Sequence, residues 1–211
     1  MHNNYEIVEL FPTPVFAIRL PEELSTVIPF FDSQEINMEA DEGNYGQHSK
    51  DTCILDRPEC KDLSSFILKE AHRFGSDILG YDYDGYKFSQ SWVSYKQPGQ
   101  HHSGHTHPNS LISGVFYYGP IQSDTPAINF HKFIASVNVS YVKPKVKPKV
   151  SKYLESESAF NIEPGLMILF PSHLMHSVPT NKTNVVRCSL AFNIVPTVGF
   201  GDVRELTELK F

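Results

Sequence analysis

From residue 86 onward the chain consists of short aromatic and β-branched runs separated by turn residues. Such runs favour strands, and their fairly regular spacing is typical of an antiparallel sandwich or barrel. We therefore predict a β-core of roughly eight strands, arranged as a jelly roll. The runs that carry this prediction are residues 86–95, 110–118, 127–130, 165–170 and 185–195.

The first 85 residues have a different pattern, which predicts a layer packed on that core. Strands are expected at 5–11 and 15–20, followed by a short helix that opens at Pro21. From Pro58 to Gly80, apolar residues recur at spacings of three and four and predict one packing helix. The polar stretch 39–52 is expected to be a long surface loop. We thus expect a single domain over 1–211, with 1–85 packing on a core at 86–200.

The amino-acid composition argues against some classes of function and location. The formal net charge is −6 over 211 residues, which argues against general binding of duplex nucleic acid, because phosphate contacts need clustered Lys and Arg. No apolar run approaches 18 residues, and the N-terminus lacks a signal-peptide core, so we expect no membrane span. Three cysteines cannot pair completely, which indicates a reducing, cytoplasmic compartment. The segment 142–150, rich in Lys and Pro, is expected to be a solvated loop or a basic patch.

Six of the ten histidines fall in two short clusters, at 101–107 and 173–176. His105 and His107 are two residues apart, so on a strand both imidazoles point to one face and can reach one metal ion. A third ligand would come from the second cluster, which follows an apolar strand. Three protein ligands leave open positions, as a catalytic metal requires. The alternative is a histidine pair that faces solvent.

Arg187 lies inside the predicted strand at 185–195, where an arginine needs an anion as a partner. Its planar guanidinium matches a carboxylate through two hydrogen bonds, and Ser189 on the same face adds another donor. We infer capture of a dicarboxylate beside the metal. A structural salt bridge to Asp or Glu is the alternative.

These residues resemble the Fe(II)/2-oxoglutarate-dependent oxygenases, and more narrowly a bacterial and phage group of them. The similarity spans roughly residues 8–195, and its motifs are specific only in combination. It rests on Leu10-Phe-Pro-Thr-Pro-Val15, Ser91-Trp92, the segment His105-Thr-His-Pro-Asn-Ser continuing to Tyr118, Glu163-Pro-Gly continuing to His176, and Arg187-Cys-Ser-Leu-Ala-Phe-Asn193.

The resemblance implies a double-stranded β-helix with a mononuclear Fe(II) and 2-oxoglutarate as co-substrate. His105 matches the first ligand and His176 the distal one, while Arg187 and Ser189 match the residues that bind the far carboxylate of 2-oxoglutarate. Tyr95 matches a tyrosine that often binds the same carboxylate.

The sequence departs from the family pattern at His107, where the wider superfamily has Asp or Glu. His107 is expected to be the third ligand; otherwise water or another carboxylate takes that position. Three neutral imidazoles also suit Zn²⁺. His101, His102 and His173 are expected at the pocket rim or the surface, and Trp92, Phe116 and Tyr117 are candidates for the pocket lining.

The implied activity is that of a dioxygenase, which uses dioxygen, converts 2-oxoglutarate to succinate and carbon dioxide, and hydroxylates a small-molecule or peptide substrate. One alternative is a cupin-type three-His metal protein without a co-substrate, although the second cupin motif is absent. Another is a metal-free jelly-roll binding or virion module. Exposed strand edges would permit a homodimer.

Overall fold

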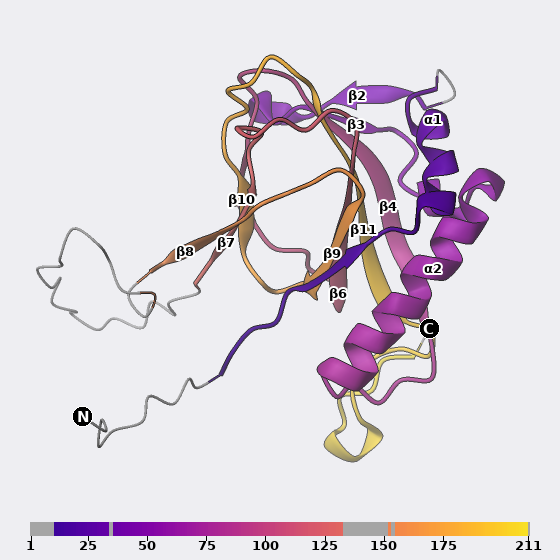
Figure 1. Cartoon of the computed structure of the whole chain (residues 1–211). Coiled ribbons are helices and arrows are strands. Elements are labelled where there is room, and N and C mark those ends of the chain that lie inside the picture. Colours follow the sequence, from indigo (N-terminus) through magenta and orange to yellow (C-terminus); the bar gives the residue numbers. More distant parts are fainter. Residues whose placement is uncertain (1–10, 34–35, 133–151, 153–154, 211) are drawn as a thin grey trace, which may run out of the picture.

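Two antiparallel sheets face each other and enclose the interior of the molecule (Figure 1). The computed structural model describes residues 11–33, 36–132, 152 and 155–210. The larger sheet has seven strands in the order β1-β9-β6-β11-β4-β3-β2, and the smaller has four in the order β5-β10-β7-β8. The expected strand at 5–11 and the segment 142–150 lie outside the described residues.

The strands confirm the predicted mainly β class. Those of the larger sheet are β1 (Phe16–Arg19), β2 (Met38–Ala40), β3 (Gln47–Ser49), β4 (Tyr86–Lys96), β6 (Ile112–Tyr118), β9 (Leu166–Pro171) and β11 (Arg187–Pro196). Those of the smaller sheet are β5 (His102–His105), β7 (Ile128–His131), β8 (Glu157–Phe160) and β10 (His176–Val178).

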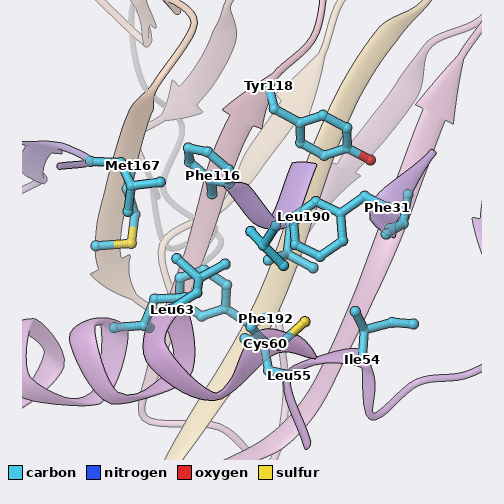
Figure 2. Close-up of a cluster of buried hydrophobic side chains, with 14 of the residues drawn as sticks. Phe31, Ile54, Leu55, Cys60, Leu63, Phe116, Tyr118, Met167, Leu190 and Phe192 are labelled. Atoms are coloured by element: carbon cyan, nitrogen blue, oxygen red, sulfur yellow. The ribbon is translucent and has the colours of Figure 1, made fainter. Parts of the chain in front are cut away.

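Helices cover the outer face of the larger sheet. The predicted packing helix is α2 (Lys61–His72), which continues as a π-helical segment, Arg73–Ile78. Its apolar stripe is buried against the sheet, and Figure 2 shows Leu63 of α2 in one buried cluster with Phe116, Leu190 and Phe192. The shorter helices are Glu22–Val27, α1 (Ile28–Phe31), Glu42–Asn44, Ile54–Asp56, Pro58–Cys60 and Val203–Glu205.

Strand alternation divides the larger sheet into an outer face toward the helices and an inner face toward the smaller sheet. On β11, Leu190 and Phe192 belong to the core under α2, whereas Arg187 and Ser189 line a cavity on the inner face. Successive side chains of a strand point to opposite faces, so one strand supplies both the core and the cavity wall.

The expected surface loop at 39–52 is instead a hairpin, β2 and β3, that extends the larger sheet beyond β4. Its strands are only three residues long, Met-Glu-Ala in β2 and Gln-His-Ser in β3, so they are too short for a pattern of apolar residues to mark them in the sequence. At Gly46 (φ +116°) a Cβ would lie 2.4 Å from the Tyr95 carbonyl oxygen, so the close approach to β4 requires glycine.

None of the helices in the described part of the chain combines the length and the apolar character needed to cross a bilayer.

Candidate metal centre and adjoining pocket

A cavity of about 250 Å³ opens between the two sheets. The strand register of the larger sheet places the side chains that line this cavity in rows across neighbouring strands. Arg187 lies opposite Lys96 in one row, and Ser189 lies between Tyr117 and Ser94 in the next. Other side chains that line the cavity are Asp41, His48, Thr52, Gln90, Trp92, His102, His105, His107, Ile128, His176 and Val178.

Three histidines converge on the smaller-sheet side of this cavity. His105 ends β5 and His176 begins β10, and the two are directly paired in the antiparallel register. His107 follows β5, and its backbone N–H donates to the Ser172 carbonyl oxygen at 3.0 Å. One nitrogen from each ring lies within 4.8 Å of the others, so the structure brings all three predicted ligands together.

Hydrogen bonds fix two of the imidazole tautomers. His105 Nδ1 lies 2.9 Å from the Ser103 carbonyl oxygen, and His176 Nδ1 lies 2.9 Å from the Leu174 carbonyl oxygen. A carbonyl oxygen only accepts, so each Nδ1 carries the proton and each Nε2 keeps its lone pair. Both rings thus present the form of imidazole that binds a metal ion.

His107 contacts a buried polar chain rather than a backbone carbonyl. Its Nδ1 lies 3.5 Å from Asn193 Nδ2. The Asn193 carboxamide in turn contacts Ser113 Oγ at 2.9 Å, and Ser113 Oγ lies 2.8 Å from Ser172 Oγ. Ser172 donates to Ser110, whose hydroxyl donates to backbone carbonyl oxygens. This series of hydrogen-bonded side chains holds the imidazole of His107 in place.

Burial keeps the three imidazoles neutral. Burial, together with the neighbouring imidazole rings, lowers the pKa of His107 to about 4 and that of His176 to about 3. Burial also lowers the pKa of His105. Neutral imidazoles are the ligand form, and three of them around one point fit a divalent ion such as iron or zinc. No carboxylate of the described residues joins this group.

The remaining clustered histidines lie around this centre. His102 stacks on His105, with ring centroids 4.2 Å apart, and lines the cavity. His101 meets the Tyr45 ring edge-on at 5.2 Å. His173 is exposed. None of them belongs to the three-nitrogen group.

Arg187 and Tyr117 form a buried polar end of the cavity. Arg187 is 2 % exposed, its Nε donates to the Pro126 carbonyl oxygen at 3.2 Å, and its guanidinium lies 5.1 Å from the centre of the Tyr117 ring. The Tyr117 hydroxyl is buried without a hydrogen-bond partner among the described residues. Burial raises its pKa to about 12, against the opposing effect of Arg187.

A structural salt bridge does not explain why the charged side chain of Arg187 is buried. Burial lowers its pKa, and the groups that raise it again are Tyr117 and Cys188, with no Asp or Glu of the described residues among them. A buried guanidinium without an acidic partner, beside a buried phenol without a hydrogen-bond partner among the described residues, is costly unless an anion binds there. Together with Ser189, they form a site shaped for a carboxylate.

The structure does not bring Tyr95 to this site. Its side chain points to the outer face, where the hydroxyl donates to the Phe31 carbonyl oxygen (2.9 Å) and contacts Asp32 Oδ1 (2.7 Å). The next residue, Lys96, faces the cavity instead. Phe116 likewise belongs to the outer core, whereas Trp92 and Tyr117 line the cavity.

Comparison with known proteins identifies the class to which this fold and site belong. Residues 90–193 match a family model described as "Putative 2OG-Fe(II) oxygenase". They contain the three clustered histidines, Arg187, Ser189 and Tyr117. The β-core over these residues therefore matches the 2OG-Fe(II) oxygenase family. No curated protein matches the sequence.

Solved structures share the fold at low sequence identity. A 2OG-Fe(II) oxygenase family oxidoreductase from Burkholderia pseudomallei is 15 % identical, with a TM-score of 0.53 over 84 % of this chain and 83 % of the other. A Pseudomonas putida prolyl-4-hydroxylase is 13 % identical, with a TM-score of 0.56 over 86 % and 92 %. HygX from Streptomyces hygroscopicus, crystallised with nickel and 2-oxoglutarate, is 15 % identical, with a TM-score of 0.62 over 89 % and 84 %. These likenesses confirm the double-stranded β-helix.

Proposed function

We propose that the protein is an Fe(II)-dependent dioxygenase that couples oxidation of a second substrate to decarboxylation of 2-oxoglutarate. In this reaction a C–H bond of the second substrate becomes C–OH, and 2-oxoglutarate and dioxygen become succinate and carbon dioxide. The observation that carries the proposal is the presence, in one cavity, of three neutral imidazoles and a buried guanidinium without an acidic partner.

The histidines would hold the metal ion. His105 and His176 offer Nε2 because their Nδ1 protons are bound to backbone carbonyl oxygens. His107 would be the third ligand, held by Asn193 and the hydrogen-bonded serines behind it. When bound, Fe(II) together with 2-oxoglutarate supplies the activation of dioxygen, and the protein supplies position and a dry pocket.

Arg187, Tyr117 and Ser189 would bind the distal carboxylate of 2-oxoglutarate. The guanidinium offers a planar pair of N–H donors, and the Tyr117 hydroxyl lacks any other acceptor among the described residues. Ile128 and Val178 also line the cavity, and their apolar side chains would limit the access of water to it. A carboxylate there would neutralise Arg187 and satisfy the phenol at once.

The test is binding and turnover with purified protein. Anaerobic titration with Fe(II) and then 2-oxoglutarate should produce the visible absorption of a chelated keto acid, and oxygen should then yield succinate. Arg187→Met should weaken 2-oxoglutarate binding by about tenfold to hundredfold, as loss of a buried charged hydrogen bond does, without loss of metal. Arg204→Met, at an exposed site, is the matched control.

Two outcomes would contradict the proposal. A protein that binds iron but neither binds nor decarboxylates 2-oxoglutarate would be a cupin-type metal protein. A folded protein that binds no metal would be a binding module.

Three further expectations are proposals of the same kind: a single domain over 1–211, a cytoplasmic location and a homodimer. The free thiols of Cys53, Cys60 and Cys188 support a reducing compartment. Size-exclusion chromatography with light scattering tests the dimer.

A further inference from the structure

Lys96 is a second buried cation in the cavity, and the proposed reaction has not used it. It ends β4 directly opposite Arg187 and is 2 % exposed. Its Nζ donates to the Tyr45 carbonyl oxygen at 2.8 Å and contacts Ser94 Oγ at 3.4 Å, both neutral acceptors. Burial, together with the proximity of Arg187, lowers its pKa to about 8.

The two cations face different parts of the cavity. Arg187 bonds to Pro126 and lies beside Tyr117 on β6, on one side of β11. Lys96 bonds to Tyr45, between β2 and β3, on the other side. A carboxylate held between Arg187 and Tyr117 would therefore lie on the β6 side of β11, whereas the Lys96 ammonium is held toward the turn between β2 and β3.

The loaded cavity would also carry an excess of positive charge. A divalent metal on three neutral imidazoles contributes two positive charges, and Arg187 and Lys96 contribute one each. The 2-oxoglutarate dianion cancels two of these four. Asp41 lines the cavity and raises the pKa of Lys96, but its carboxylate is bonded to His48 at the rim. The cavity therefore keeps at least one positive charge, and uncompensated buried charge is costly.

The space beside Lys96 is continuous with the metal centre. Trp92 lies on the same strand and face, and its ring centroid is 6.0 Å from that of His107. Thr52 and Gln90 line the same cavity. A ligand here would have a cation at one end, an indole along its body and the histidine cluster within reach.

We propose that Lys96 binds a carboxylate of the second substrate, which is therefore a small organic acid lying against Trp92 beside the three histidines. This inference rests on the proposed function. It assigns Lys96 to substrate recognition and Arg187 to 2-oxoglutarate.

The test separates the two anions by direct binding. Protein loaded with Ni²⁺ in place of iron is titrated calorimetrically with 2-oxoglutarate. The proteins are wild type, Lys96→Met, Lys96→Arg, Arg187→Met and the exposed control Lys50→Met. Lys96→Met should change 2-oxoglutarate affinity by less than about threefold, whereas Arg187→Met should lower it by about tenfold or more. Circular dichroism confirms that each variant is folded.

The same loaded proteins are then titrated with four- to eight-carbon carboxylic acids, including amino and hydroxy acids, and with the primary amide of each. At least one acid should bind wild type about tenfold more tightly than its amide does. Lys96→Met should abolish that preference, and Lys96→Arg should keep part of it.

Three results would overturn the assignment: loss of 2-oxoglutarate binding in Lys96→Met as large as in Arg187→Met, no acid preference in wild type, or a preference that survives in Lys96→Met. Failure of the proposed function looks different, because wild type would then not bind 2-oxoglutarate at all.

Discussion

The Asn193 carboxamide faces His107, with Asn193 Nδ2 and His107 Nδ1 3.5 Å apart. Rotation of this amide by 180° would present its oxygen to an Nδ1 proton and its NH₂ to Ser113. The hydroxyls of Ser113, Ser172 and Ser110 can then donate in one direction, ending on a backbone carbonyl oxygen. In that arrangement His107 keeps its lone pair on Nε2, as His105 and His176 do.

Replacement of Asn193 by alanine should therefore weaken metal binding by about 10- to 100-fold, the usual effect of losing a partner that orients a ligand. The measurement is competition with a chelator of known affinity. Asn181→Ala is the control, since Asn181 is equally buried but bonds to Lys96 and Val185 backbone carbonyls. It should lower the melting temperature and leave metal affinity unchanged. Equal metal losses in both variants would show that the effect is only structural.

His107 itself offers a test of the three-histidine centre. His107→Ala should lower metal affinity by about 100-fold or more, because an inner ligand is lost. His107→Asp should restore much of it, since a carboxylate is also a ligand for iron. The exposed His173→Ala should have no effect. Metal content by mass spectrometry reports each result, and full metal occupancy in His107→Ala would exclude His107 as a ligand.

Tyr117 and the next residue form a matched pair of variants. Both hydroxyls are buried without a hydrogen-bond partner in the described part of the chain, but Tyr117 faces the cavity and Tyr118 packs in the outer core. Tyr117→Phe should weaken 2-oxoglutarate binding by about tenfold, the value of one buried hydrogen bond to a charged group. Tyr118→Phe should leave it unchanged. Calorimetry measures the affinity of both variants for 2-oxoglutarate. Identical affinities would exclude the Tyr117 hydroxyl from the binding site.

The buried histidines predict how the metal-free protein responds to acid. The pKa values of His107 and His176 are about 4 and 3, below the ordinary value of 6.5. Between pH 6.5 and 4 the unfolded chain binds protons that the folded chain does not, so folding stability is complete above pH 6.5 and falls as the pH drops.

Urea unfolding in the presence of a chelator, at several pH values from 7.5 to about 4.5, measures this loss. The variant His107→Gln should show a shallower dependence, because one of the contributing groups is gone. A dependence as steep as that of wild type would mean that other groups cause the acid sensitivity.

The sequence predicted the ligands better than their surroundings. His105 and His107 share a face through the two-residue period of a strand, and their spacing is visible without a structure. The cavity wall was harder to predict, because β6 and β11 are buried on both faces and carry no apolar alternation. The apolar pattern of β6 does not distinguish Tyr117, which lines the cavity, from Phe116, which packs in the outer core. Tyr95 was expected in the site only from the family resemblance, and its side chain points to the outer face while that of the next residue, Lys96, faces the cavity.

The hairpin of β2 and β3 was missed for a different reason. Its pairing with β4 comes from backbone hydrogen bonds and from the close approach at Gly46, and neither leaves a hydrophobic signature in polar sequence.

That hairpin pairs with β4 in the larger sheet, and its turn also contacts the smaller sheet. The Tyr45 ring stacks on His102, and its hydroxyl lies 3.0 Å from Ser103 Oγ in β5, the strand that ends at His105. The hairpin supplies Asp41 and His48 to one wall of the cavity and no residue to the three-histidine group. Residues 38–49 thus brace the strand that presents His105 while they also form one wall of the cavity. Changes in the hairpin would therefore alter the cavity wall and the support of a metal ligand at the same time.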